Sequence, residues 1–190
     1  MRVLLVYSNR TRIMEPAPPI GLSYVATAAQ RAGHEVRFVD LMISRDPHGE
    51  LRAALYDFAP EVVGFSVRNI DNIIAQSISW QINEVSTLIA ITREHSRAQI
   101  VLGGPAISIL GGRRAQAAGR GLCGGREGEV TFPQLLSAIG GSRDFSGISG
   151  LCYRANHKVM ANAPLRLEEF GGSGMEQWIR WRPYERAGST

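Results

Sequence analysis

Short apolar runs alternate with longer amphipathic segments along the first part of the chain. Continuous apolar runs at Val3–Tyr7, Val62–Ser66 and Ile100–Leu102 are typical of parallel strands that are covered on both faces. A short run at Glu35–Val39 predicts another strand, and residues 121–124 predict a weak fifth strand. The chain therefore contains five candidate strands.

Helices are predicted between these strands. Apolar positions recur at helical spacing from Ile20 until Gly33, a residue type that commonly ends helices. A second helix is predicted at Glu50–Phe58, and it should end there because Pro60 follows. Irregular backbone is predicted at residues 76–83. Further helices are predicted at Glu84–Glu94, Arg113–Ala118 and Glu129–Ile139.

The alternation of strands and helices predicts an α/β fold. Strands joined by short helical crossovers form right-handed units around a parallel sheet. Five such units fit a doubly wound sheet with the strand order 2-1-3-4-5. We expect this sheet to occupy one domain, residues 1–145.

The pattern changes beyond this domain. Two strand-like segments, Ile148–Tyr153 and Lys158–Met160, predict a small antiparallel hairpin at the sheet edge, within residues 146–162. Residues 163–190 contain no obvious core segment, so we expect a linker there. Its aromatic side chains are expected to dock on another surface; they are Trp178, Trp181 and Tyr184.

The composition is that of a globular protein with little clustering of charge. Of the 190 residues, 44% are hydrophobic and 20% are charged, which allows a core and argues against a disordered chain. The net charge is +4, but the arginines are scattered and Lys158 is the single lysine. This pattern argues against nucleic-acid binding, which needs a basic patch.

The sequence predicts a cytoplasmic protein. No apolar run reaches the roughly 18 residues that a membrane span needs, and no signal-peptide pattern opens the chain. Cys123 and Cys152 are too few for a disulfide scaffold and too far apart in the sequence for a local thiolate cluster. We therefore expect two free thiols in a reducing compartment.

Glycines lie where the fourth predicted strand ends. In a doubly wound sheet the ligand crevice lies beyond the carboxyl ends of the strands, at the switch point between strands one and three. Gly103-Gly104 removes two side chains there, which lets backbone N–H groups approach a ligand. A plain turn before Pro105 is the equally good alternative interpretation.

Polar residues lie at two other strand ends. Arg68 and Asn69 directly follow a buried strand, and helix capping does not explain an arginine at this place, so both are candidate ligand contacts. Glu127 and Glu129 open a predicted helix, where carboxylates also interact favourably with the helix dipole. At least one of these glutamates is explained by that interaction alone.

Common cofactor signatures are absent from the sequence. No Gly-x-Gly-x-x-Gly follows the first strand and no Gly-x-x-x-x-Gly-Lys occurs, which argues against dinucleotide and nucleoside-triphosphate sites. The acidic residues and the lysine of a phosphoaccepting receiver are missing as well. None of the four histidines has a partner at metal-ligand spacing.

Several individually weak motifs occur in one characteristic order. They are Pro18-Pro19-Ile20-Gly21-Leu22-Ser23-Tyr24-Val25-Ala26, Gly33-His34-Glu35-Val36, Val63-Gly64-Phe65-Ser66-Val67-Arg68-Asn69-Ile70-Asp71-Asn72, Gly103-Gly104-Pro105 and Glu127-Gly128-Glu129. Together they resemble the N-terminal cobalamin-binding domain of B12-dependent radical S-adenosylmethionine (SAM) proteins, such as the anaerobic magnesium-protoporphyrin ester cyclase family. The resemblance covers about residues 1 to 160, since the segment from Gly147 to Arg154 is similar to the strand that follows this domain.

The resemblance implies a Rossmann-like, or flavodoxin-like, domain that binds cobalamin. The corrin would rest on the loops after strands one, three, four and five, with the nucleotide tail in the crevice. No catalytic residue is implied. Cofactor contacts are implied at Ile20, Gly21, Ser66, Val67, Arg68, Asn69, Gly103, Gly104, Pro105, Glu127, Gly128 and Glu129.

The resemblance also bears on the cobalt ligand. Many B12 proteins carry a cobalt-ligating histidine in an Asp-x-His-x-x-Gly loop after the first strand, whereas here Asp46-Pro47-His48-Gly49 follows the second strand with another spacing. Base-off cobalamin without a histidine ligand is therefore implied, with Arg68 or Asn69 under the lower face and no residue bound to metal. Arg126 stands where the family usually has glycine, so its guanidinium is expected to crowd the corrin or the nucleotide tail and to weaken binding.

In this family a catalytic barrel holds a [4Fe-4S] cluster on a Cys-x-x-x-Cys-x-x-Cys triplet and uses SAM. The present sequence has no such triplet, so we expect a truncated chain or a stand-alone module that is inactive alone, related to a methyltransferase or cyclase. Two alternatives stay open. One is a flavodoxin-like module that binds FMN or another phosphorylated ligand through Ser8-Asn9-Arg10-Thr11, and the other is an interaction module that docks through the aromatic tail.

Overall fold

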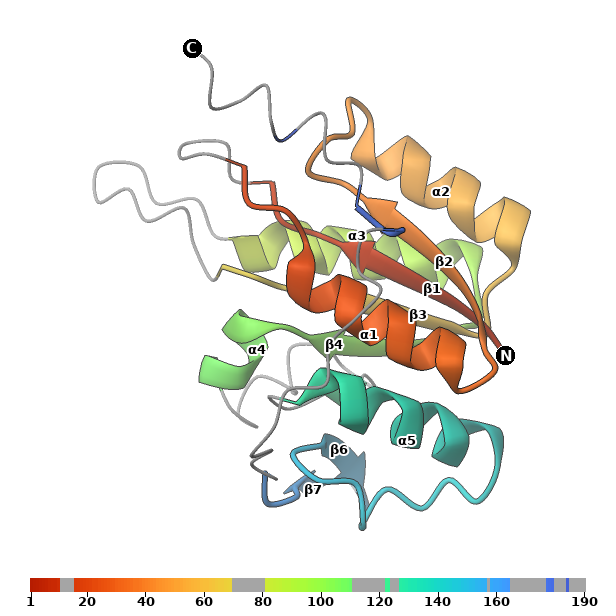
Figure 1. The fold of residues 1–190 in the computed structure, drawn as a ribbon, viewed down its shortest axis with the longest axis vertical. Coiled ribbons are helices and arrows are strands. Elements are labelled where there is room, and N and C mark those ends of the chain that lie inside the picture. Colours follow the sequence, from red (N-terminus) through yellow and green to blue (C-terminus); the bar gives the residue numbers. More distant parts are fainter. Residues whose placement is uncertain are drawn as a thin grey trace.

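A single mixed sheet crosses the protein. The structure is a computed structural model that describes residues 1–10, 16–69, 81–110, 122–123, 127–156, 158–164, 177–179 and 184. In these residues seven strands lie in the order β2-β1-β3-β4-β5-β6-β7 (Figure 1). The strands are β1 (Arg2–Tyr7), β2 (Glu35–Asp40), β3 (Val62–Ser66), β4 (Gln99–Gly103), β5 (Leu122–Cys123), β6 (Cys152–Ala155) and β7 (Lys158–Ala161). The helices are α1 (Ile20–Arg31), α2 (Pro47–Phe58), α3 (Gln81–His95), α4 (Pro105–Leu110) and α5 (Gly128–Gly140).

The parallel part of the sheet has four full strands in the order β2-β1-β3-β4. This confirms the predicted α/β fold and the order of its first four strands. The expected fifth strand has only two residues, Leu122 and Cys123, which pair in parallel with β4. The predicted five-stranded parallel sheet is therefore confirmed only for four full strands, and the fifth, which the sequence predicts as weak, is a two-residue segment. Glycines at positions 121 and 124 give the segment little strand propensity.

The predicted antiparallel hairpin is present as β6 and β7. Its turn residue Asn156 has φ 48°, in the left-handed region that tight hairpin turns require. The first strand of this hairpin, β6, begins at Cys152 and not at Ile148 as predicted, and Ile148 is buried in the core before it. The Asn162 side-chain amide donates hydrogen bonds to the carbonyl oxygens of Phe145 (2.6 Å) and Ile148 (2.8 Å), which ties this loop to the hairpin.

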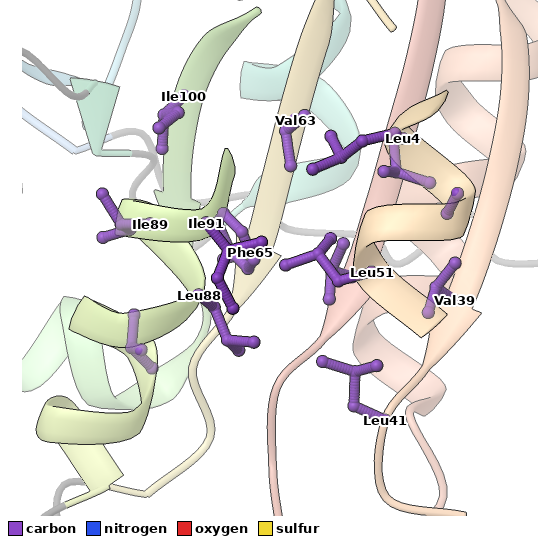
Figure 2. Close-up of a cluster of buried hydrophobic side chains, with 14 of the residues drawn as sticks. Leu4, Val39, Leu41, Leu51, Val63, Phe65, Leu88, Ile89, Ile91 and Ile100 are labelled. Carbon is purple, nitrogen blue, oxygen red and sulfur yellow. The ribbon is translucent and has the colours of Figure 1, made fainter. Parts of the chain in front are cut away.

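Two helical layers cover the sheet. Leu4 and Val6 face the layer of α2 and α3, where side chains such as Leu51, Leu88 and Phe65 interdigitate (Figure 2). Val3 and Leu5 face the opposite layer of α1 and α5 (Figure 1). Each fully buried aliphatic or aromatic side chain contributes about 1.5–3 kcal/mol. Strand β1 is thus covered on both faces, as its unbroken apolar run predicts.

Residues at the helix ends explain where α1 ends and where α2 begins. Gly33 adopts φ 84° directly after α1, and its N–H donates to the carbonyl oxygen of Gln30 at 3.0 Å. Helix α2 begins at Pro47, three residues earlier than predicted, because the Asp46 carboxylate accepts the Gly49 N–H at 2.9 Å. The helix predicted at 113–118 lies outside the described residues, and α4, which was not predicted, directly follows Gly104.

The described residues of the tail contact α1 and β2. The Trp178 indole N–H donates to the Thr27 hydroxyl at 2.9 Å, and its ring stacks on Phe38 with 6.2 Å between centroids. The Tyr184 hydroxyl donates to a carboxylate oxygen of Asp40 at 2.5 Å. These contacts lie at the β2 edge of the sheet, whereas the hairpin forms the opposite edge.

Two adjacent glycines are expected to differ in their tolerance of a methyl group. A Cβ on Gly104, whose φ is 97°, would lie 2.6 Å from the Val67 carbonyl oxygen, whereas a Cβ on Gly103 meets no atom within 4 Å. Gly104→Ala should therefore lower the free energy of unfolding by about 1–3 kcal/mol. Gly103→Ala should change it by less than about 0.5 kcal/mol. Urea unfolding of both variants checks this, and equal losses would contradict it.

Candidate functional site

A cavity of about 570 Å³ opens at the carboxyl ends of the parallel strands. Its floor is made of residues that lie side by side in the sheet register: Leu5 on β1, Gly64 on β3 and Val101 on β4. The first turns of α1 and α5 form two walls, and α4 contributes to the rim. The cavity therefore occupies the place at which doubly wound sheets bind ligands.

The missing side chain at Gly64 gives the floor its depth. A Cβ at this position would lie 2.8 Å from the Leu5 Cδ2 atom and 3.7 Å from the Phe132 ring. An added Cβ would thus require the Leu5 side chain to shift and would come into contact with the Phe132 ring. The sequence contained a signal for this site, since a glycine inside a buried strand marks a close approach by another group.

The Gly103-Gly104 pair has features of both interpretations that its sequence allowed, a tight turn and a border of the ligand crevice. Gly104 packs on the Val67 backbone, and the Val67 N–H donates to the Gly103 carbonyl oxygen at 2.8 Å, so the loops after β3 and β4 are joined. This is the structural role of a tight turn. Gly103, in contrast, borders the cavity with open space above it.

Several polar side chains lie near the mouth of the cavity, beside β1. The Tyr7 hydroxyl donates to the Ala17 carbonyl oxygen at 2.9 Å and accepts from the Asn9 side-chain amide at 3.2 Å. Burial raises the pKa of Tyr7, and the Asn9 hydrogen bond and the Arg68 charge oppose this shift. Arg68 is exposed at the mouth, so its charge reaches both Tyr7 and the cavity. Tyr7 thereby anchors the proline-rich loop that forms part of the wall.

Helix α5 brings two carboxylates to the opposite wall. Glu127 and Glu129 border the cavity, and the Glu127 carbonyl oxygen accepts the Thr131 N–H at 2.9 Å as the helix begins. A Cβ on Gly128 would lie 2.9 Å from a methyl carbon of Val25, so this glycine allows α1 and α5 to approach closely. The predicted helix start is confirmed, and it places negative charge opposite Arg68.

The structure brings ten of the twelve predicted contacts to this cavity; whether they touch a ligand stays a prediction. They are Ile20, Gly21, Ser66, Arg68, Gly103, Gly104, Pro105, Glu127, Gly128 and Glu129. Val67 is buried behind the loop, and Asn69 does not border the cavity. Sequence reasoning missed the apolar lining, because these side chains resemble ordinary core residues; they include Leu5, Tyr24, Val25, Val101 and Phe132.

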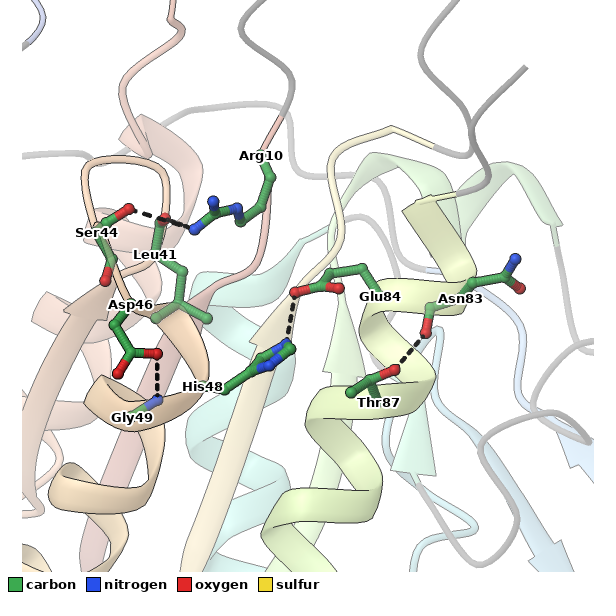
Figure 3. Close-up of polar contacts among 9 residues, drawn as sticks. All are labelled: Arg10, Leu41, Ser44, Asp46, His48, Gly49, Asn83, Glu84 and Thr87. Carbon is green, nitrogen blue, oxygen red and sulfur yellow. Dashed lines mark hydrogen bonds and ion pairs between the residues drawn. The ribbon is translucent and has the colours of Figure 1, made fainter. Parts of the chain in front are cut away.

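Histidines do not border the cavity in the described part of the chain. His48 lies in the layer of α2 and α3, where its Nε2 contacts the Glu84 carboxylate at 3.1 Å (Figure 3). His34 lies at the other end of the strands, 3.4 Å from the terminal amino group, and burial lowers its pKa. Within the described residues, no group of three or more His, Cys, Asp or Glu could hold a metal ion.

The comparison with known families agrees with this geometry. A family model described as the B12 binding domain matches residues 10–136, most of the α/β domain. The chain therefore belongs to the B12-binding domain family, as the resemblance in its sequence predicts.

Known proteins extend this similarity. The chain is 28% identical over 156 residues to the uncharacterized methyltransferase PH0819 of Pyrococcus horikoshii, which covers 79% of this chain and 31% of that protein. It is 32% identical over 76 residues to the hopanoid C-3 methylase of Methylococcus capsulatus, covering 38% of this chain and 14% of that protein.

A solved structure is similar over nearly the whole chain. It is the radical SAM methyltransferase TsrM from Kitasatospora setae with cobalamin and a [4Fe-4S] cluster bound, which has a TM-score of 0.77 and 28% identity. The match covers 90% of this chain and 30% of TsrM. The chain thus spans less than a third of the length of PH0819 or TsrM.

None of the helices described here is both long and apolar enough to cross a membrane.

A buried tyrosine, Tyr7, and a half-buried one, Tyr184, lie beside Asp40 and predict a loss of stability at high pH. Burial raises the pKa of Tyr7 and of Tyr184 above the usual value of 10.0, and the Asp40 hydrogen bond raises that of Tyr184 further. Because the folded-state pKa is raised, the stabilisation is fully present below pH 10 and declines above it.

Urea unfolding at increasing pH tests this expectation. The free energy of unfolding should fall less steeply above pH about 10 in Tyr7→Phe and Tyr184→Phe than in the wild type. Tyr56→Phe is the matched control, because this tyrosine is 88% exposed on α2. Identical slopes in all four proteins would show that neither the Tyr7 nor the Tyr184 hydroxyl contributes to the loss of stability.

Proposed function

We propose that this domain binds cobalamin as the B12-binding part of a radical SAM methyltransferase or cyclase. The observation that carries the proposal is the cavity at the carboxyl ends of β1, β3 and β4, where most sequence-predicted contacts meet. Family membership and the similarity to TsrM support the choice of cofactor.

The residues present fit such a group. A cavity of about 570 Å³ lies within the usual range for ligand pockets and has mostly apolar walls with a few placed polar groups. The aromatic base of the nucleotide tail would contact Leu5, Val101 and Phe132, and the open space over Gly103 leaves room for it. Arg68 and Glu127 at the mouth would then hydrogen-bond the amide-bearing edge of the corrin.

When bound, cobalamin would supply the cobalt chemistry for methyl transfer. The residues of this chain bind and orient the cofactor, and none is assigned to catalysis. Two similar proteins are named methyltransferases and a third a methylase, which favours methyl transfer over cyclisation. A radical SAM domain with its own cluster and SAM is the partner that this function requires.

The cofactor is proposed to bind base-off without a histidine ligand. His48 is paired with Glu84 in the other layer, and the cavity lining contains no histidine among the described residues. Arg68 is the better candidate for the lower face, since it borders the cavity and Asn69 does not. Arg126 lies outside the described residues, so its predicted effect on binding stays a prediction.

The FMN alternative has little support in the loop after β1. The Ser8 hydroxyl donates to the Ser66 carbonyl oxygen at 2.9 Å. The Arg10 guanidinium donates to the carbonyl oxygens of Leu41 (3.2 Å) and Ser44 (3.4 Å), toward the α2 side (Figure 3). In the described part of this loop, the Ser8 and Arg10 groups are therefore used within the protein, whereas Thr11 lies outside the described residues.

The interaction-module alternative relied on free aromatic anchors. Trp178 and Tyr184 already contact Thr27, Phe38 and Asp40 of the same domain. Trp181 lies outside the described residues. The contacts of the tail therefore favour an intramolecular role for two of the three side chains.

A tryptophan at Gly103 should block the site. Its side chain would enter the open space beside the cavity, so hydroxocobalamin affinity should fall at least about tenfold, a change of about 1.4 kcal/mol. Gly147→Trp is the matched control, because this glycine also has open space around its Cβ but lies in an exposed loop away from the cavity. Gel filtration after spectral titration measures retention of the cofactor. Equal hydroxocobalamin affinity of both variants and the wild type would contradict the assignment of the site.

The spectrum of the bound cofactor tests the cobalt ligand separately. Wild type and His48→Ala should give the same base-off absorption spectrum, and the Co(II) form should show no nitrogen hyperfine splitting in electron paramagnetic resonance. His34→Ala and His95→Ala serve as further controls on histidines outside the cavity lining. A nitrogen splitting that disappears in one histidine variant would identify a ligand and refute the histidine-free proposal.

A further inference from the structure

The fold brings the two cysteines of the chain together. Cys123 ends β5 and Cys152 begins β6, and these strands run antiparallel with Cys123 directly opposite Cys152. In the described residues this is the register pair that joins the parallel sheet to the hairpin. The two cysteines are far apart in the sequence, and the sheet register places their backbones opposite each other.

The backbone geometry of this pair suits a covalent link. Directly opposite residues on antiparallel strands have Cα atoms about 4.5–5.5 Å apart. A disulfide accepts Cα separations of about 4.4–6.8 Å, a range that includes this spacing. The Cys152 thiol is free and partly exposed, which makes it accessible to an oxidant.

We propose that Cys123 and Cys152 are a modification site at which a reversible cross-strand disulfide forms. One S–S bond forms while the two thiols lose two protons and two electrons. The electrons pass to an oxidant of the disulfide class, such as oxidised glutathione, whose own S–S bond is reduced to two thiols. The step uses no metal and no cobalamin, so it does not rest on the proposed function.

The position of the link determines what it stabilises. Strand β5 has only two residues and is held by Leu122, which is buried beside Val101 at the cavity floor. The segment between the two cysteines contains all of α5, which forms one wall of the cavity. A disulfide would therefore close a loop around this wall and join the hairpin to the sheet, which reduces the conformational freedom of the unfolded chain.

Oxidation of the full chain with oxidised glutathione tests the proposal. We expect free thiols to fall from two to none per chain, and peptide mapping without reductant should give a Cys123–Cys152 crosslink in the monomer. The melting temperature should rise on the order of 5 °C or more, and dithiothreitol should reverse both changes. Oxidation should speed up at higher pH, because burial raises the pKa of the Cys152 thiol and the thiolate is the attacking species.

Single variants separate this outcome from other oxidation products. Cys123→Ser and Cys152→Ser should each abolish the crosslink and the rise in melting temperature on oxidation. Persistent free thiols, a stable mixed disulfide with glutathione, or a disulfide-linked dimer as the main wild-type product would each overturn the proposal. Cobalamin is absent throughout, so failure here leaves the proposed cofactor site untouched.

Discussion

The contact between Gly104 and the backbone of Val67 determines where the cavity opens. Parallel strands end at one edge of the sheet, and the loops after β3 and β4 can meet there only because Gly104 has no Cβ. The Val67 N–H and carbonyl oxygen bond to Gly103 and Ala106, so the turn also positions the start of α4. The rim of the cavity thus follows from one close backbone contact.

Two further glycines extend this effect across the site. Gly64 lowers the floor between Leu5 and Phe132, and Gly128 lets the first turn of α5 approach Val25 on α1. The side chains that remain around the space are mainly apolar, whereas Arg68 and the glutamates of α5 lie at its mouth. An apolar interior with charged groups at the entrance suits an amphipathic ligand that inserts one end.

Both edges of the sheet carry C-terminal segments. The hairpin continues the sheet beyond β5, and the tail residues Trp178 and Tyr184 bond to α1 and to the end of β2. Asp40 links the tail electrostatically to Tyr7, and Tyr7 holds the proline-rich loop of the cavity wall. Asp40 and Tyr7, which both lie at strand ends, therefore connect the described tail residue Tyr184 with the cavity wall.

The sequence by itself determined most of the described elements, the order of the first four strands and the edge at which the cavity opens. These depend on local properties: the period of apolar residues, the left-handed backbone at Gly33 and the glycine pair after β4. The exact starts of α2 and β6 differed, and for α2 the reason is the Asp46 cap, which places the helix start at Pro47.

Only the tertiary structure decided which distant residues meet. The floor at Gly64 and the pairing of Cys123 with Cys152 arise from sheet register, and the contact of His48 with Glu84 arises from packing of α2 on α3. None of these pairs is marked by spacing along the chain. Contacts between residues far apart in the sequence depend on how strands align and helices pack, which the local pattern of side chains does not encode.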